Sequence, residues 1–228
     1  MNYDEQLAEV AGYADKAPVA EQGSAAWLQQ RVGHCTASRF KDARDFTKGG
    51  KSSAKREGYK MEVLVERLTG SAFEHFVSAA MIHGTETEPL ARMAYEAATG
   101  AMVEQVSFIH HPKIKWIGGS PDGLIGEDGG VEFKCPQPPE HIRILMTEEL
   151  DDYLPQVQGL MWITGRQWFD FVSYCPMLPN GLQLYTKRIA RDESFIKQLA
   201  DEVQQFLLEV DELHQKLLER SDGFIYKR

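Results

Sequence analysis

The stretch that decides the expected fold is Ser120-Pro-Asp-Gly-Leu-Ile-Gly-Glu-Asp-Gly-Gly-Val-Glu-Phe-Lys-Cys135. Pro121 and Gly123 surround Asp122 with residues that favour turns, so the Asp122 carboxylate is expected at the mouth of a strand. Residues 127–130, which end in two adjacent glycines, are typical of a hairpin connection. The stretch therefore predicts two short antiparallel strands joined by a tight turn.

The second strand of this hairpin is expected to present two charged side chains on one face. Successive strand residues point to opposite faces, so Glu132 and Lys134 share a face. Phe133 points to the other face, with Val131 and Cys135, toward the core. Burying a carboxylate and an ammonium on an otherwise apolar strand is costly without a purpose. A surface hairpin with a simple ion pair is the alternative interpretation.

Hydrolysis of a phosphodiester would use these charges. Asp122 and Glu132 could hold Mg²⁺, which prefers oxygen ligands. The ion would lower the pKa of a water molecule and neutralise charge that grows on the phosphate. Lys134 would orient the attacking water or stabilise the developing negative charge. The sequence leaves the hairpin register open, so the meeting of Asp122 and Glu132 is a prediction.

Helices are expected before this hairpin. Ser24 caps a short helix that contains Trp27 and ends near Gly33, and Thr36 caps the next helix. Residues 47–53 lack apolar periodicity, which indicates a basic loop. The further helical ranges are 37–46, 55–68 and 73–99, the last interrupted near Gly84 and Pro89.

Strands and helices alternate in the rest of the chain. Short apolar runs bounded by turn residues predict strands at 102–110, 115–118, 123–125, 131–135, 168–174 and 183–189. Helical spacing predicts helices at 139–146, 153–163 and 192–220. The expected fold class is α/β (α+β), a central mixed β-sheet flanked by helices. We expect one domain over 24–228, preceded by a flexible lead-in over 1–23.

The charge of the chain is unevenly distributed. The formal net charge of −9 at first argues against a polyanionic partner. However, residues 39–60 contain eight basic and three acidic side chains, whereas 192–219 contain eight acidic side chains and two lysines. This distribution indicates either a basic surface that faces DNA or two solvated faces without a partner.

The three cysteines are far apart and form no CxxC pair, so the sequence offers no ligand framework for a structural zinc or an iron–sulfur cluster. No apolar run approaches the roughly 20 residues that span a bilayer. Residues 1–22 lack the apolar core of a signal peptide. We therefore expect a cytoplasmic protein with reduced thiols and no membrane association.

Ordered blocks of a recognisable pattern extend over nearly the full chain. They are Glu21-Gln-Gly-Ser-Ala-Ala-Trp-Leu28, Arg31-x-Gly33, Thr36-Ala-Ser38, Ser120-Pro-Asp-Gly123, Glu132-Phe-Lys-Cys-Pro136, Gln156-Val-Gln158 and Met161-Trp162. An Asp…Glu-x-Lys pattern alone arises often by chance, whereas several ordered blocks are far more specific. Together they resemble the lambda exonuclease / YqaJ-like viral recombinase family of the PD-(D/E)xK nuclease superfamily.

The resemblance implies roles for the residues of the hairpin. Asp122 and Glu132 would be metal ligands, joined by the backbone carbonyl of Phe133. Lys134 would be the catalytic lysine, and Gln156 would be the active-site glutamine unless it is a capping or surface residue. The implied cofactor is Mg²⁺, with Mn²⁺ as a substitute.

Glu88 falls where the family places a further acidic ligand of the metal, with Glu86 as the alternative. By itself, Glu88 equally suits a helix start beside Pro89. Two departures from the family pattern lie nearby. His83 replaces an aromatic residue, and Pro89 disfavours helical geometry at Glu88, which could displace that carboxylate.

The resemblance also implies a pocket for a 5′-terminal phosphate, formed by Arg31, Ser38 and Ser120. A guanidinium binds phosphate oxygens through two parallel hydrogen bonds, and hydroxyls add further donors. Without the resemblance, Arg31 is an ordinary charge at a helix end and Ser38 an ordinary polar residue.

Two further positions are uncertain from the sequence. Met81 aligns with an apolar wedge of the family, but a methionine at helical spacing is more often a core residue. Residues 137–143 lack a basic residue that the family places near the substrate phosphates, so His141 or Arg143 is expected to replace it.

The resemblance implies a processive 5′→3′ exonuclease that digests one strand of linear double-stranded DNA from a 5′-phosphorylated end. The product would be a 3′ single-stranded overhang for phage-type recombination. Implied partners are two further copies in a homotrimer and a phage-type single-strand annealing protein, in the cytoplasm of a bacterial host. The alternatives are a restriction or junction-resolving endonuclease of the same superfamily, and a catalytically silent DNA-end-binding recombination scaffold.

Overall fold

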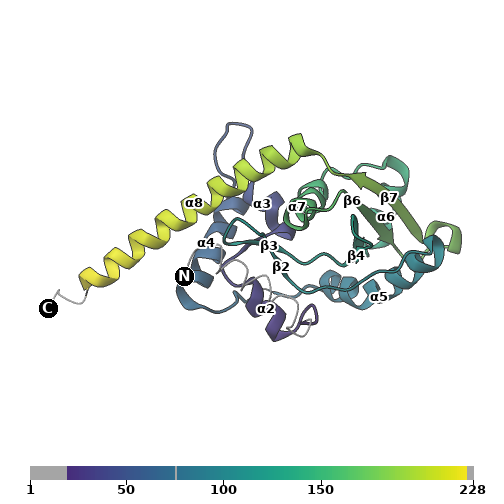
Figure 1. The fold of residues 1–228 in the computed structure, drawn as a ribbon, viewed down its shortest axis with the longest axis horizontal. Helices are drawn as coiled ribbons and strands as arrows, with labels where there is room; N and C mark the ends of the chain where they lie inside the picture. The colour runs from purple at the N-terminus through teal and green to yellow at the C-terminus, as the bar shows by residue number, and fades with distance from the viewer. Residues whose placement is uncertain (1–19, 75, 225–228) are drawn as a thin grey trace.

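A computed structural model of the chain describes residues 20–74 and 76–224 (Figure 1). The predicted lead-in over 1–23 thus lies largely outside the described residues. In chain order the elements are α2 (Ala25–Arg31), β1 (Cys35–Thr36), η1 (Ala37–Arg39), α3 (Phe40–Ala43), α4 (Ala54–Thr69), α5 (Ala79–Thr99), β2 (Ile109–His110), β3 (Ile117–Gly119), β4 (Gly123–Ile125), β5 (Gly129–Lys134), α6 (Pro138–Thr147), α7 (Leu154–Thr164), β6 (Trp168–Tyr174), η2 (Asn180–Leu182), β7 (Leu184–Ala190) and α8 (Glu193–Phe224).

The main sheet has the strand order β4-β5-β6-β7. Strands β4 and β5 form the predicted antiparallel hairpin, β5 and β6 run parallel, and β6 and β7 run antiparallel. A smaller sheet has the order β1-β3-β2, with β1 parallel and β2 antiparallel to β3. The predicted mixed sheet flanked by helices is therefore confirmed, and the smaller sheet was not expected.

Helices cover both faces of the main sheet. On one face, Ala91 and Tyr95 of α5 pack against Val131, Phe133 and, on β6, Val172. On the other face lie α6 and α7, and α7 packs in turn on α3 and α8. Helix α4 packs on α3 and α8 and completes the largest apolar cluster. The two faces of β5 therefore contact different helices. Phe133 points toward α5, whereas Glu132 and Lys134 point to the opposite face.

Polar side chains fix the ends of several helices where the sequence predicts them. Ser24 accepts a hydrogen bond from the backbone nitrogen of Trp27, and Ser53 does the same for Arg56 at the start of α4. Helix α4 ends at Gly70, whose φ of 68° lies in the left-handed region that glycine adopts without strain. These caps confirm the predicted bounds of α2 and α4 to within a residue or two.

The predicted helix over 37–46 is wrong in detail. A 3₁₀ turn, η1, is followed by α3, which ends at Ala43. Thr36 makes no side-chain cap there. Its hydroxyl instead lies within hydrogen-bond distance of Ser38 and Arg31, and its backbone nitrogen donates to the hydroxyl of Tyr59. Long-range partners thus replace the local cap.

The predicted interruption of the helix over 73–99 is also wrong. Helix α5 is continuous, begins at Ala79 after a Ser78 cap, and contains Pro89. Proline removes one helical hydrogen bond, a cost that burial of Ala91 and Tyr95 against the sheet can offset. The predicted strand over 102–110 is reduced to β2 and an isolated bridge between Glu104 and Leu124.

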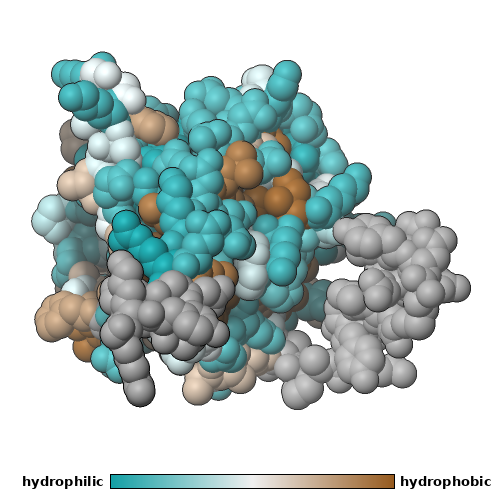
Figure 2. Space-filling model, turned by 90° about the vertical axis from the view of Figure 1, so that its left-hand side faces the viewer, coloured by the Kyte–Doolittle hydropathy of each residue, from teal (hydrophilic) through white to brown (hydrophobic). Residues whose placement is uncertain are grey.

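The long helix α8 extends beyond the body of the molecule in Figure 1. Its apolar stripe is buried against α4 and α7. On the face shown in Figure 2, hydrophilic side chains predominate and apolar ones form small separate patches. Within the described ranges, no helix combines the length and the apolar character required to cross a membrane.

Candidate active site

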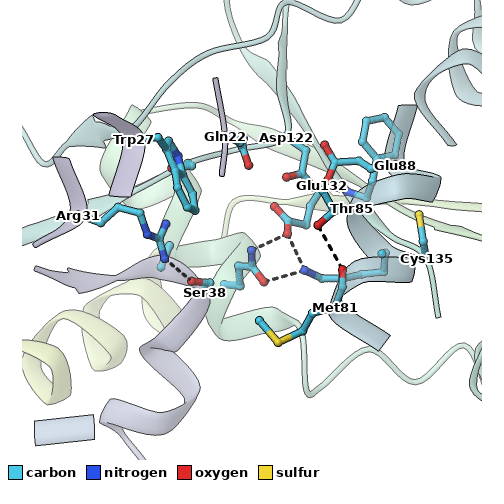
Figure 3. A pocket seen from close by; sticks show the side chains of 16 residues that line it. Gln22, Trp27, Arg31, Ser38, Met81, Thr85, Glu88, Asp122, Glu132 and Cys135 are labelled. Carbon is cyan, nitrogen blue, oxygen red and sulfur yellow. Dashed lines mark hydrogen bonds and ion pairs between the residues drawn. The ribbon is translucent and has the colours of Figure 1, made fainter. Parts of the chain in front are cut away.

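The charged residues of the hairpin meet in one pocket of about 520 Å³ (Figure 3). Gly123 pairs with Val131 in the β4–β5 register, which places Asp122 beside the middle of β5. The carboxylate of Asp122 accepts a 2.7 Å hydrogen bond from the backbone nitrogen of Phe133. The register that the sequence left open therefore brings Asp122 and Glu132 to the same cavity.

A hydrogen-bonded group links the ends of Glu132, Lys134 and Gln156. Nζ of Lys134 lies 2.7 Å from Oε1 of Glu132 and donates to Oε1 of Gln156 over 3.0 Å. The amide of Gln156, from α7, donates to the same Oε1 of Glu132. The side chains of Glu132 and Lys134 are 2 % and 27 % exposed, so this ion pair is not the surface pair of the alternative interpretation.

The carboxylates of the pocket repel one another in a poorly solvated space. Burial, followed by the charges of Glu132 and Glu88, raises the pKa of Asp122 well above its usual value. Burial also raises the pKa values of Glu132 and Glu88. Burial alone would lower the pKa of Lys134, but the neighbouring carboxylates outweigh it and raise that pKa. Lys134 is the one basic side chain within hydrogen-bond distance of these three carboxylates among the described residues, so their mutual repulsion is only partly compensated.

The donor set fits a hard divalent cation. Oε2 of Glu132 is buried and has no hydrogen-bond partner among the described residues, which is costly unless a ligand binds it. No three acidic, histidine or cysteine side chains form a ready-made metal cage in the described ranges. Magnesium requires only one or two carboxylates because it retains several waters. The residues that could hold it are Glu88, Asp122, Glu132 and, through its carbonyl, Phe133.

Of the two candidate metal ligands on α5, Glu86 and Glu88, the structure places Glu88 at the pocket. Glu88 lines the cavity beside Asp122 and Glu132, whereas Glu86 is exposed and does not line it. Helix α5 is continuous through Pro89, so Glu88 keeps helical geometry. The expected displacement of Glu88 by Pro89 is therefore wrong. His83 lies one turn earlier, with its Nδ1 3.4 Å from the hydroxyl of Thr87.

Arg31 and Ser38 lie on the other side of the same pocket (Figure 3), which Ser120 also lines. The guanidinium of Arg31 lies 3.4 Å from the hydroxyl of Ser38 and stacks over the ring of Trp27. The indole nitrogen of Trp27 donates to Ser120. Arg31 makes no ion pair with a described residue, and its burial lowers its pKa. An unpaired, partly desolvated guanidinium beside hydroxyls is suited to binding an anion.

Several residues of the pocket were not predicted from the sequence. Gln22 donates a 3.2 Å hydrogen bond to the carbonyl of Pro121, so this end of the expected lead-in is docked at the site. For Met81 the sequence left a family wedge and a core residue as alternatives, and its side chain is not in the core, since Met81 is 54 % exposed and lines the pocket. Thr85 also lines the cavity. The spacing of Met81, Thr85 and Glu88 on one face of α5 is the signal that would have identified them.

The two expected replacements for a missing basic residue do not reach the pocket. His141 is fully buried, and its ring nitrogens lie 2.7 Å from Ser173 and 2.8 Å from the carbonyl of Leu182. Arg143 forms an ion pair with Glu140 on the surface of α6. Neither side chain lines the pocket, and both bind other parts of the protein.

The helix-flanked mixed sheet, with acids and a lysine at the rim of its hairpin, has the fold of a nuclease. A family model, the YqaJ-like viral recombinase domain, matches residues 26–167, and the chain belongs to this family. The structure is similar to the alkaline exonuclease LHK-Exo from Laribacter hongkongensis, with 40 % identity, a TM-score of 0.81, and coverage of 88 % of this chain and 100 % of that chain.

Two further solved structures are similar to this chain. LHK-Exo in complex with dAMP matches with a TM-score of 0.82 at the same identity and coverage. A phage-related exonuclease from Haemophilus somnus 129PT has a similar fold, at 17 % identity, with a TM-score of 0.66 and coverage of 81 % of this chain and 96 % of that chain. No curated protein matches the chain.

Proposed function

We propose that this protein is a magnesium-dependent, processive 5′→3′ exonuclease that digests one strand of linear double-stranded DNA from a 5′-phosphorylated end. The main support is that one pocket contains both the acid–lysine group of Asp122, Glu132 and Lys134 and the anion-binding group of Arg31 and its hydroxyl neighbours. Cleavage chemistry and recognition of a strand end are thereby adjacent.

The two sides of the pocket would perform different tasks. Arg31, with the hydroxyls of Ser38 and Ser120, would hold the terminal phosphate and so fix which phosphodiester reaches the acids. Lys134, held by Glu132 and Gln156, would orient the attacking water or stabilise charge on the scissile phosphate. When bound to the acids, a divalent cation supplies Lewis acidity toward the phosphate and the water.

The placement of the end-binding group beside the acids favours release of mononucleotides. A strand whose terminal phosphate rests at Arg31 can present only a nearby phosphodiester to Asp122 and Glu132. LHK-Exo, the 40 % identical relative, is known in complex with the mononucleotide dAMP. Repeated steps of this kind would leave a 3′ single-stranded overhang for phage-type recombination.

The proposed assembly is a homotrimer that acts with a phage-type single-strand annealing protein in the cytoplasm of a bacterial host. Enclosure of DNA by a ring would retain a chain with a net charge of −9 on a polyanionic substrate. A measurement of molar mass by light scattering tests the trimer directly, since a monomeric mass of 25.8 kDa would contradict it.

The proposed activity is tested by magnesium-dependent digestion of three DNAs: linear with a 5′-phosphate, linear with a 5′-hydroxyl, and a covalently closed circle. We expect mononucleotide release to be fastest from the phosphorylated end and absent from the circle. Asp122→Asn should abolish release. Asp128→Asn should retain it, because Asp128 lies in the hairpin turn and does not line the pocket.

Other outcomes would support the alternatives. Cleavage of the circle would indicate an endonuclease that uses the same acids without a strand end. Tight binding of linear DNA with no release by the unmodified protein would indicate a recombination scaffold. Release that begins at the 3′ end would contradict the direction proposed here.

A further inference from the structure

A second cavity, of about 590 Å³, continues from the active pocket. The two cavities share five lining residues, which are Gln22, Trp27, Met81, Thr85 and Glu88. The second cavity then extends along α5 to Pro89 and Arg92 and across to Gln105 and Val106. The active pocket is therefore not closed on the side of Glu88, and a bound strand has room to continue beyond the acids.

One face of α5 forms a wall along both cavities. Met81, Thr85, Glu88 and Arg92 are spaced by four, three and four residues, which places them in one row on a helix. The first three line both cavities, and Arg92 lines the second. The row therefore leads from the wedge-like Met81, past the acid of the active pocket, to a cation one helical turn further on.

Arg92 is the one basic side chain among the described residues that line the second cavity. It is half-buried and makes no ion pair or side-chain hydrogen bond with any residue that the structure describes. The acidic residues that line the second cavity with it are Glu88, one turn earlier on α5, and the exposed Glu21. Glu96 lies one turn later on α5, outside the cavity lining, and its carboxylate accepts a backbone hydrogen bond. By contrast, Arg39 and Arg56 are engaged with acidic partners.

We propose that Arg92 and the second cavity form a binding subsite for the DNA phosphate that follows the scissile phosphate on the digested strand. This inference rests on the function proposed above. Arg31 and Glu88 lie on opposite sides of the active pocket (Figure 3), and Arg92 lies one turn beyond Glu88. A strand held at Arg31 and cleaved at the acids would place its next phosphate toward Arg92.

A contact at this phosphate has a clear use. The scissile phosphodiester would be held from both sides, which fixes its orientation toward the acids better than the terminal phosphate alone. Arginine suits the task because its guanidinium donates two parallel hydrogen bonds to phosphate oxygens. The role is one of substrate positioning, since Arg92 would not touch the reacting atoms.

The experiment removes, in turn, the positive charge of Arg92 and the negative charge of the phosphate that it is proposed to bind. Arg92→Gln is compared with the unmodified protein on 5′-phosphorylated duplexes that carry a neutral methylphosphonate in place of the third phosphate from the 5′ end. A duplex with the neutral linkage at the sixth phosphate serves as the substrate control. Lys197→Gln, which removes an exposed charge on α8, serves as the protein control.

We expect Arg92→Gln and the neutral third phosphate each to lower kcat/KM for the first cleavage by about tenfold, and their combination to lower it no further. If the losses caused by Arg92→Gln and by the neutral third phosphate multiply when the two are combined, the proposal is overturned. It is also overturned if a neutral sixth phosphate lowers kcat/KM as much as a neutral third phosphate does. A changed magnesium requirement with unaltered dependence on the third phosphate would also overturn it, because Arg92 would then act on Glu88 alone. Failure of the proposed function is distinguishable, since the unmodified duplex would not be degraded at all.

Discussion

The indole nitrogen of Trp27 donates a 2.9 Å hydrogen bond to the hydroxyl of Ser120, 93 residues further along the chain. The same indole ring lies beneath the guanidinium of Arg31, with 4.3 Å between the guanidinium carbon and the ring centroid. One aromatic side chain therefore fixes two groups of the proposed end-binding pocket at once. Trp27 therefore positions both groups, a role that its local sequence does not indicate.

Substitution of Trp27 by phenylalanine should weaken the preference for a 5′-phosphate. Phenylalanine retains a ring beneath Arg31 but lacks the donor to Ser120, and a neutral hydrogen bond contributes about 1 kcal/mol. We expect the ratio of rates on 5′-phosphate and 5′-hydroxyl ends to fall roughly fivefold. Ser120→Ala should lower this ratio at least as much, because Ser120 is itself a proposed phosphate donor, and the double variant should lower it little further than Ser120→Ala. Independent effects of the two substitutions would contradict a shared role.

Substitution of Arg31 by glutamine should remove most of the end preference. Hydrogen bonds between charged groups contribute about 1.5–3 kcal/mol, which corresponds to a loss of roughly 10- to 100-fold. Because Arg31 has no acidic partner in the described structure, its loss should leave the thermal midpoint nearly unchanged. Rate measurements on the two DNA ends test this expectation, and an unaltered ratio would exclude Arg31 from the phosphate pocket.

Magnesium should stabilise the fold through Glu88 and not through Glu86. An ion at 100 times its Kd stabilises a protein by about 2.7 kcal/mol, a rise of roughly 5–10 °C in Tm for a chain of this size. Glu88→Gln should reduce this rise, whereas Glu86→Gln, in the exposed residue of the same helix, should retain it. Thermal unfolding of the two variants with magnesium and with a chelator measures the rise in Tm of each. Equal responses of the two variants would remove Glu88 from the metal site.

The ion pair between α4 and α8 should make the fold sensitive to acid. Hydrogen bonds from Arg56, with help from Lys60, hold the pKa of Glu209 at about 2, below its ordinary value of 4.5. A depressed pKa stabilises the fold above pH 4.5, and this contribution is lost as the pH falls from 4.5 to 2.

Glu209→Gln should therefore lower stability by roughly 1–3 kcal/mol at neutral pH, less than a fully buried pair because the side chain of Glu209 is 29 % exposed. The difference from the unmodified protein should shrink below pH 4.5 in denaturant titrations. Glu212→Gln, on the same helix without an ion pair to the described residues, is the control. A difference that is independent of pH would show that charge is not the cause.

Two glycines with left-handed backbone should tolerate alanine differently. Gly33 has a φ of +74°, and an added Cβ would lie 2.8 Å from Cγ of Arg67, whereas Gly70 has a φ of +68° and open space around it. Gly33 cannot shift easily, because Glu66 and Arg67 bind its backbone nitrogen and oxygen. We expect a cost of about 1 kcal/mol for Gly70→Ala and roughly 2–4 kcal/mol for Gly33→Ala, from urea midpoints. Similar costs would contradict the close approach.

The elements that the sequence predicted correctly have strong local signals. Ser24 and Ser53 start helices with cap hydrogen bonds, Gly70 ends one, and the alternation along β5 places Glu132 and Lys134 on one face. Prediction was wrong where a distant partner outweighed the local rule. Thr36 uses its hydroxyl in contacts with Arg31 and Ser38 instead of capping a helix, and α5 is continuous through Pro89.

The sequence by itself determined the hairpin, the shared face of its acid and lysine, and the family to which the chain belongs, because these depend on residues close together or on ordered motifs. Only the tertiary structure decided that Glu88 reaches the hairpin acids, that Trp27 joins Arg31 to Ser120, and that Arg92 lines a continuing cavity. Those relations depend on how α2 and α5 pack against the sheet. That packing is set by burial of apolar side chains far apart in the chain, which no local pattern specifies.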